Sequence, residues 1–153
     1  MSEEELQHWM GVALDQAAKA YAEGEVPIGA AAVLDGELIA ADHNRSIQLN
    51  DPTAHCEVLV LRECGRKLGN YRLNGLVLFT TVEPCAMCAG ALVWARISTV
   101  VFGTRDEKSG AVVSKASLLD EGLFNHNVKV VEGIQAEESR LILRRFFEDR
   151  RGR

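Results

Sequence analysis

Four side chains that suit zinc chemistry stand in two short motifs. His55 and Glu57 are two residues apart, and Cys85 and Cys88 are three apart behind Pro84. One imidazole and two thiolates form the donor set of a catalytic zinc ion that keeps its fourth position for water. On a helix, residues three apart project from one face, so Cys85 and Cys88 can grip the same ion. We therefore expect His55, Cys85 and Cys88 to bind one zinc ion per chain, with Glu57 as the catalytic proton carrier.

Each half of this pattern also has a simpler explanation. A lone C-x-x-C can be a redox pair, and a lone histidine near an apolar helix is usually a core residue. The two halves together, with Glu57 and Pro84 in place, favour the metal site. A closed structural zinc site would need a fourth protein ligand, for which Cys56 and Cys64 are candidates. We expect Cys56 to point away from the ion and Cys64 to lie in the core.

Two helices are expected to position the motifs. The first opens between residues 51 and 53, carries His55 near its start and ends near Gly69. The second has Pro84 at its first helical position, where the missing N–H costs no hydrogen bond, and ends near Arg96. The positive end of a helix favours the thiolate form that binds metal. Two helix starts that converge on one ion would build a rigid site.

The rest of the chain predicts one mixed sheet with further helices. Ser2 and Glu5 form a capping-box pattern at the start of a helix that ends at Gly24. Strands are expected at residues 26–34, 37–41, 76–80, 97–102 and 128–131, with a hairpin turn at Asp35-Gly36. The 76–80 and 97–102 strands flank the cysteine-bearing helix and should be parallel. A short helix is expected at residues 115–119 and a last one at 137–149. The expected fold is a single α/β domain, residues 1–153: a three-layer α/β/α sandwich with a mixed five-stranded sheet.

Composition agrees with a cytoplasmic enzyme that does not enter a membrane. Of the 153 residues, 47% are hydrophobic and 25% are charged, which is ordinary for a globular domain. No stretch approaches a membrane span, and the first residues are acidic where a signal peptide would be basic. Four cysteines without an export signal favour metal ligation in a reducing compartment over disulfides.

The motifs and their surroundings resemble a known family. His55-Cys56-Glu57 with Pro84-Cys85-Ala86-Met87-Cys88 resembles the cytidine-deaminase superfamily of zinc enzymes. Further stretches are similar to the bacterial tRNA-specific adenosine deaminases within it: Gly24-Glu25-Val26-Pro27-Ile28-Gly29-Ala30, Asn44-Arg45, Asp51-Pro52-Thr53-Ala54-His55, Asn70-Tyr71-Arg72-Leu73, Val101-Phe102-Gly103, Asp106, Lys108, Gly110-Ala111, Asn125-His126 and Phe146-Phe147 with Arg150-Arg151. Two departures are Cys56, where the family usually has alanine, and Val112-Val113 before Ser114, where it tends to have glycine.

The resemblance implies hydrolytic, zinc-dependent conversion of adenosine to inosine at the wobble position of a tRNA anticodon. Asn44 would then hydrogen-bond the target nucleoside, although a turn asparagine is an equally good explanation. Val26, Pro27 and Ile28 would line the base pocket, unless they are plain core residues. The remaining RNA contacts are expected from Lys108, Asn125, Phe147, Arg150 and Arg151. The resemblance also implies a homodimer through the helix that follows the zinc cysteines, whose small or adaptable residues are Ala86, Met87, Ala89, Gly90 and Ala91.

RNA binding needs a local basic surface, because the net charge is −5. The C-terminus supplies a candidate beside Phe146 and Phe147, with Arg144, Arg145, Arg150, Arg151 and Arg153. A charge run is usually a solvated face, so both explanations stay open.

Two other functions remain possible from the sequence. A deaminase of free guanine or cytosine would share the metal site, and a non-catalytic zinc module could bind RNA as a scaffold. Glu57 argues against the scaffold, which has no need of a carboxylate there.

Overall fold

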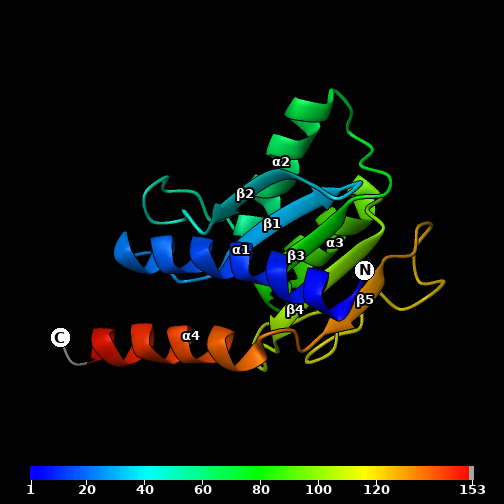
Figure 1. The fold of residues 1–153 in the computed structure, drawn as a ribbon. Helices are drawn as coiled ribbons and strands as arrows, with labels where there is room; N and C mark the ends of the chain where they lie inside the picture. The colour runs from blue at the N-terminus through cyan, green and yellow to red at the C-terminus, as the bar shows by residue number, and fades with distance from the viewer. Residues whose placement is uncertain (152–153) are drawn as a thin grey trace.

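A five-stranded mixed sheet forms the centre of the protein, with helices on both of its faces (Figure 1). The computed structural model describes residues 1–151, so Arg153 lies outside the described residues. The strands are β1 (Gly29–Leu34), β2 (Glu37–His43), β3 (Val77–Val82), β4 (Thr99–Thr104) and β5 (Lys129–Glu132). The helices are α1 (Glu3–Ala22), α2 (Cys56–Leu68), α3 (Ala86–Ala95) and α4 (Ala136–Arg151). No helix in the described part is long and apolar enough to cross a membrane.

The sheet has the order β2-β1-β3-β4-β5. β1 is antiparallel to β2 and β3, whereas β3, β4 and β5 are parallel to one another. The expected hairpin between β1 and β2 is confirmed, and its two turn residues, Asp35 and Gly36, have φ of 51° and 78°. This double left-handed conformation is the one that a two-residue hairpin turn needs. The parallel pairing of β3 with β4 around α3 is also confirmed.

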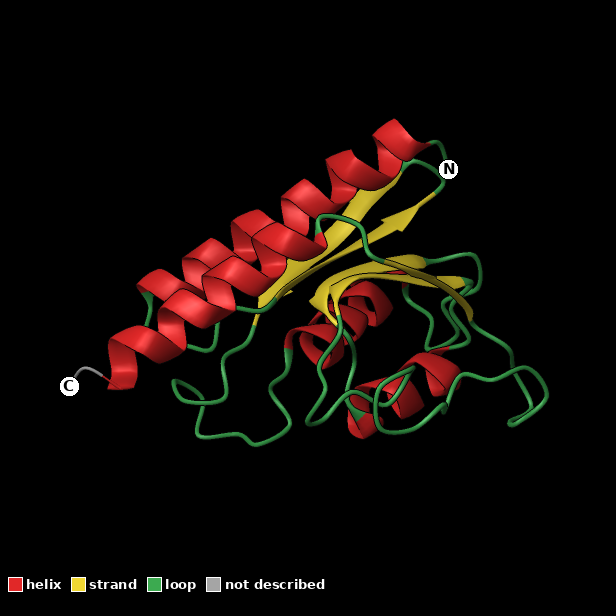
Figure 2. Ribbon diagram, turned by 90° about the horizontal axis from the view of Figure 1, so that it is seen from below, coloured by secondary structure: helices red, strands yellow, loops and turns green. Residues whose placement is uncertain are grey.

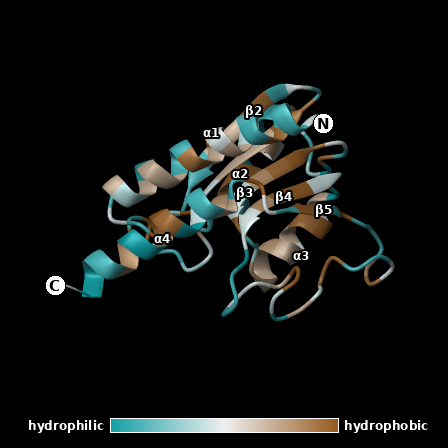
Figure 3. Cartoon of the chain, turned by 60° about the horizontal axis from the view of Figure 1, so that its bottom comes forward, coloured by the Kyte–Doolittle hydropathy of each residue, from teal (hydrophilic) through white to brown (hydrophobic). Residues whose placement is uncertain are grey.

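Alternate residues of the strands build two separate cores. Ala31 and Val33 of β1 pack on the α1 side with Met10, while Ala30 and Ala32 pack on the other side with residues of α2 and α3. Figure 2 shows α1 and α4 side by side on one face of the sheet, and Figure 3 shows strands of the sheet in the brown of hydrophobic residues. The three-layer sandwich is therefore confirmed.

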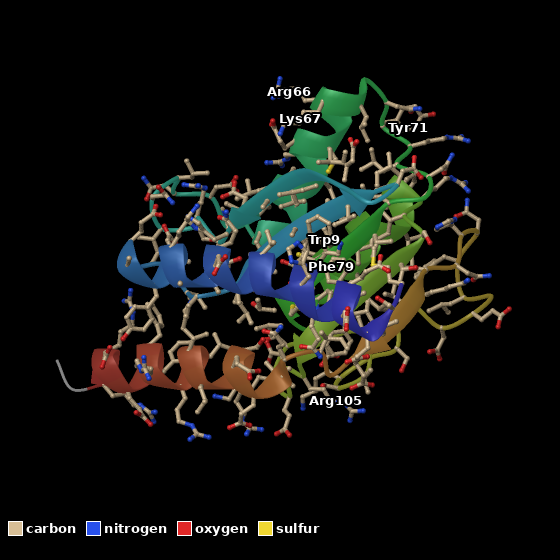
Figure 4. The ribbon with its side chains drawn as sticks, in the orientation of Figure 1. Trp9, Arg66, Lys67, Tyr71, Phe79 and Arg105 are labelled. Carbon is tan, nitrogen blue, oxygen red and sulfur yellow. The ribbon has the colours of Figure 1, made fainter. Side chains whose placement is uncertain are left out.

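Three labelled aromatic side chains mark the contrast between core and surface in Figure 4. Trp9 of α1 packs against the buried cluster that contains Phe79 of β3. Tyr71, in the loop after α2, points outward and is 77% exposed.

The start of the first strand and the start of α2 differ from the sequence prediction. β1 begins at Gly29, so Val26, Pro27 and Ile28 form an irregular segment ahead of the strand. α2 begins at Cys56 with His55 as its N-cap, and not between residues 51 and 53. The reason is that the Asp51 side chain accepts hydrogen bonds from Thr53 and so holds a turn there.

Two further predictions about helices were wrong. α3 begins at Ala86 with Cys85 as its N-cap, so Pro84 precedes the helix and is not its first residue. Residues 115–119 form turns, because the Lys115 and Leu118 N–H groups bond back to Gly110 and Ala111 and not along a helix. A five-residue segment gains too few helical hydrogen bonds to overcome the cost of starting a helix.

Candidate metal centre

His55, Cys85 and Cys88 bring their ligand atoms together at the ends of two helices. All three ligand atoms lie within 4.8 Å of one another. The Cys85 and Cys88 Sγ atoms are 3.5 and 3.6 Å from His55 Nδ1. Tetrahedral zinc, with Zn–S of about 2.3 Å and Zn–N of about 2.0–2.1 Å, separates a sulfur and a nitrogen ligand by about 3.6 Å. The spacing therefore fits zinc, and Nδ1 is the ring nitrogen that faces the ion position.

The helices position these ligands through their first residues. His55 is the N-cap of α2 and Cys85 is the N-cap of α3, while Cys88 is the third residue of α3. Both N-caps have extended backbone conformation, which lets each side chain turn back across the start of its helix. The positive ends of both helices thus point at the thiols, and this favours the thiolate forms.

Interactions among the three side chains shift their pKa values in a way that favours negative charge on Cys85. A hydrogen bond from Cys88, together with the nearby His55, lowers the pKa of Cys85 to about 4. The same shared proton raises the pKa of Cys88. A hydrogen bond with Cys85 raises the pKa of His55. These shifts favour the thiolate form of Cys85 beside the imidazole.

Glu57 lies beside the ligands and is 4% exposed. Burial raises the pKa of its carboxyl group. The Cys56 Sγ–H donates to Glu57 Oε1 at 3.0 Å, so this thiol faces the carboxylate and is not among the three grouped ligands. Cys64 is fully buried in the core on the α2 side, and burial raises its pKa to about 11.

Asn44 connects the metal centre to the segment before β1. Its Oδ1 accepts the Cys56 N–H at 2.8 Å and thereby caps the start of α2, and its own N–H donates to the Ile28 carbonyl. No residue among 1–151 hydrogen-bonds its Nδ2 group, so the amide donor is free to bind another molecule. Asn44 is 8% exposed, which places this donor at the rim of the buried site.

A groove of about 870 Å³ runs from the segment before β1 to α4. Val26, Ile28, Lys108 and Phe147 contribute to its lining, so four of the expected substrate residues share one surface. Pro27 is buried between Val26 and Ile28. A second hollow, of about 440 Å³, is lined by Lys108, Phe147, Arg150 and Arg151.

Two of the residues expected to contact RNA, Arg150 and Asn125, have surroundings that differ from those of the other expected contacts. Arg150 donates to the Gly24 carbonyl at 2.6 Å and stacks over the Phe146 ring, so it fastens α4 to the turn after α1. Asn125 lies apart from Lys108, in a hollow that Tyr71, Trp94 and Phe124 also line.

Two buried carboxylates near the site escaped sequence reasoning. Glu25 accepts the N–H groups of Ile47 and Gln48 and so fixes the loop that follows β2. Glu83 fixes the loop that follows β4: burial alone would raise its pKa, but hydrogen bonds from Ser114 and its neighbours lower it to about 2. The available signal was a charged residue directly after the apolar run 76–82, since a buried charge must be paired.

Three comparisons relate the chain to known proteins. Residues 3–104 match the model of the cytidine and deoxycytidylate deaminase zinc-binding region. The chain is 44% identical to the tRNA-specific adenosine deaminase of Bacillus subtilis over 99% of this chain and 92% of that protein. It is also 44% identical to the enzyme of the same name from Aquifex aeolicus, over 93% of each chain.

Solved structures of two kinds of deaminase resemble this chain. A solved structure from work on A-to-I editing by tRNA:A34 deaminases at the wobble position has a TM-score of 0.86 and 44% identity, covering 89% of this chain and 99% of that one. A guanine deaminase from Nitrosomonas europaea has a TM-score of 0.80 and 25% identity, covering 92% and 83%. A guanine deaminase from Bacillus subtilis is 37% identical with a TM-score of 0.63, but it covers only 69% of this chain. The fold is thus common to both activities, whereas the tRNA enzymes match nearly the whole chain, at 38–44% identity.

Proposed function

We infer that this chain, which belongs to the tRNA-specific adenosine deaminase family, converts adenosine to inosine at the wobble position of a tRNA anticodon. The observation that carries the chemistry is the His55–Cys85–Cys88 group, spaced for one zinc ion, with Glu57 buried beside it. The relatives supply the substrate, because near full-length identity of 44% joins the chain to tRNA deaminases. The guanine deaminases match less well, one at 25% identity and one at 37% identity over only 69% of this chain, which disfavours that alternative.

The reaction replaces the C6 amine of adenine with oxygen from water and releases ammonia. A zinc ion held by His55, Cys85 and Cys88 would act as a Lewis acid that lowers the pKa of the attacking water to about 7. Glu57 takes a proton from that water as the C–O bond forms at C6, and passes it to N1 of the ring. Glu57 then takes the proton of the new C6 hydroxyl and delivers it to the amine as the C–N bond breaks. One carboxyl group serves as base and then as acid because it gains each proton before it donates it.

Asn44 and the groove position the nucleoside for this chemistry. We propose that the free Nδ2 group of Asn44 donates to the nucleoside, while Val26 and Ile28 pack against the base. A base must leave its stack to reach a buried site, and anticodon-loop bases are already single-stranded. Lys108, Phe147 and Arg151 offer cationic and aromatic contacts to the flanking nucleotides.

We also propose that the chain forms a homodimer through the outer side of α3. Trp94 is 85% exposed and borders an apolar hollow of about 400 Å³ together with Tyr71 and Ala91. Large exposed aromatic groups around an apolar hollow mark a protein interface. Gly90 and Ala91 would let a partner backbone approach closely, whereas Ala89 is buried within the protomer and takes no part. Asn125 and Phe124 lie next to the same surface.

We make two further proposals, on domain organisation and on cellular location. Residues 1–153 act as a single domain, since one sheet joins the described helices. The protein works in the cytoplasm, where tRNA is found and where its four free cysteines stay reduced.

One assay tests the proposed function directly. Purified protein is incubated with an anticodon stem-loop that carries adenosine at the wobble position, and inosine is measured by nuclease digestion and chromatography. Free adenine, guanine and cytosine are tested in parallel for ammonia release. We expect inosine from the stem-loop and no ammonia from the free bases. Deamination of free guanine with no inosine in RNA would support the free-base alternative.

A further inference from the structure

The carboxylate of Glu83 is the centre of a hydrogen-bonded loop. Glu83 is 3% exposed and stands two residues before the ligand Cys85. Its Oε1 accepts the Asp106 N–H at 3.0 Å. Its Oε2 accepts three successive N–H groups, from Val112, Val113 and Ser114, at 3.1, 2.8 and 2.9 Å, and the Ser114 hydroxyl also donates to this carboxylate. Both ends of the 106–114 loop are therefore tied to one side chain.

The loop is also shaped around this carboxylate. A Cβ placed on Gly110 would meet the carboxyl carbon and both oxygens of Glu83 closer than 3.0 Å, a separation that real Cβ atoms essentially never show. The neighbouring Ala111 N–H bonds to the Pro84 carbonyl at 2.9 Å. The loop thus packs directly against the turn that leads into Cys85.

The part of the loop between these ties faces the proposed RNA surface. Lys108 lines both the large groove and the smaller hollow beside Phe147 and Arg151. Its backbone N–H is held by the Asp106 side chain, and Asp106 is in turn held by Glu83. The position of Lys108 therefore depends on a chain of hydrogen bonds that starts next to the metal ligand.

We propose that Glu83 is a positioning residue for RNA binding, which sets the place of Lys108 relative to the metal centre through the 106–114 loop. This inference rests on the proposed function, since it assigns Lys108 to RNA. Beyond the proposed function, Glu83 would influence RNA affinity although it contacts neither RNA nor zinc.

Glu83→Gln is the first test. The positioning role predicts weaker RNA binding, whereas removal of a negative charge would by itself strengthen RNA binding. Three N–H donors face Oε2, so the amide oxygen of glutamine will stay there and its NH₂ group will face the Asp106 N–H. The tie to Asp106 is then lost. We expect the Kd for the anticodon stem-loop to rise on the order of tenfold, a change typical of one lost buried hydrogen bond. Loss of a negative charge near RNA would by itself tighten binding.

Gly110→Ala disturbs the same contact from the loop side. The added methyl group must displace the Glu83 carboxylate, so the stem-loop Kd should rise as it does in Glu83→Gln. The matched controls are Gly11→Ala, where nothing lies within 4 Å of the added methyl, and Glu63→Gln, which makes the same chemical change in an exposed ion pair of α2. Both controls should bind RNA like the parent.

A double-mutant comparison with Lys108→Ala shows whether Glu83 acts through Lys108 or only stabilises the fold in general. We expect Glu83→Gln to raise the Kd by no more than about twofold when Lys108 is already alanine, because the group that it positions is gone. kcat at saturating RNA should stay within about threefold of the parent, and zinc content should not change.

The outcomes distinguish this inference from the proposed function. An unchanged or lower Kd in Glu83→Gln with zinc retained overturns the positioning role, as does an equal effect with and without Lys108. A parent chain that binds the stem-loop but forms no inosine overturns the proposed function and leaves the binding test of Glu83 valid. A parent that binds no stem-loop overturns both.

Discussion

Glu57→Gln gives the strongest test of the proposed mechanism. The side chain is 4% exposed, lies one residue after the start of α2 and follows the ligand His55 by two positions. Glutamine has nearly the same shape, and its amide oxygen can still accept the Cys56 Sγ–H. The substitution therefore removes the proton carrier and leaves the packing and the metal ligands in place.

The expected loss of activity follows from the number of proton transfers. A positioned general acid or base contributes about 10²–10⁴-fold to a rate. Glu57 carries a proton from water to N1, and it then carries a second proton from the C6 hydroxyl to the leaving amine. Because effects within one unit do not simply multiply, we expect kcat to fall by about 10⁴-fold or more. That loss corresponds to about 5 kcal/mol of transition-state stabilisation.

Glu57→Gln should lower kcat without lowering the thermal stability of the protein. Burial raises the pKa of Glu57, which means that the folded protein disfavours the charged carboxylate. A neutral amide avoids this desolvation cost. In metal-free protein, Glu57→Gln should therefore melt at a temperature no lower than the parent.

The assay is single-turnover inosine formation at saturating stem-loop, with zinc content and melting temperature measured on the same samples. Glu63→Gln, an exposed residue of the same helix, is the matched control and should keep kcat within about twofold. Inosine formation by Glu57→Gln within tenfold of the parent, with zinc bound, would refute the assigned role of Glu57.

Three further predictions concern the metal, the dimer and the RNA. Cys88→Ala should lose most of the bound zinc, whereas Cys64→Ala should retain it because that thiol is buried in the core; metal analysis of both variants decides this. Light scattering should give a dimer mass for the parent and a monomer mass for Trp94→Glu, and a monomeric parent would exclude the α3 interface. Arg151→Ala should weaken stem-loop binding and reduce the slope of log Kd against log salt by about 1, while Arg66→Ala, ion-paired on α2, should change neither.

Local sequence was enough to predict the order of elements and the grouping of three candidate metal ligands. The capping box at Ser2 and Glu5, the Asp35-Gly36 hairpin and the left-handed Gly69 at the end of α2 all depend on neighbouring residues, and all are present. The ligand types in H-x-E and P-C-x-x-C likewise carry their chemistry in short spacing, so the grouping of His55 with both cysteines followed from the motifs.

Several element boundaries differ from the prediction, because hydrogen bonds outside the regular helix pattern set them. The start of α2 is capped by Asn44, twelve residues earlier, and this bond moves the first helical residue to Cys56. Residues 115–119 do not form a helix because the segment bonds back to Gly110 and Ala111.

Sequence by itself determined the donor chemistry, the strand and helix order and the family. The tertiary structure alone decided which distant residues share a surface. It joined Lys108 to Phe147 and Arg151, separated Asn125 from them, and turned Arg150 toward the Gly24 carbonyl. It also gave Glu83 its role, since the N–H groups that surround this carboxylate come from residues 23 to 31 positions further along the chain. A buried charge must be satisfied by whatever the fold brings to it, and spacing in the sequence does not reveal those partners.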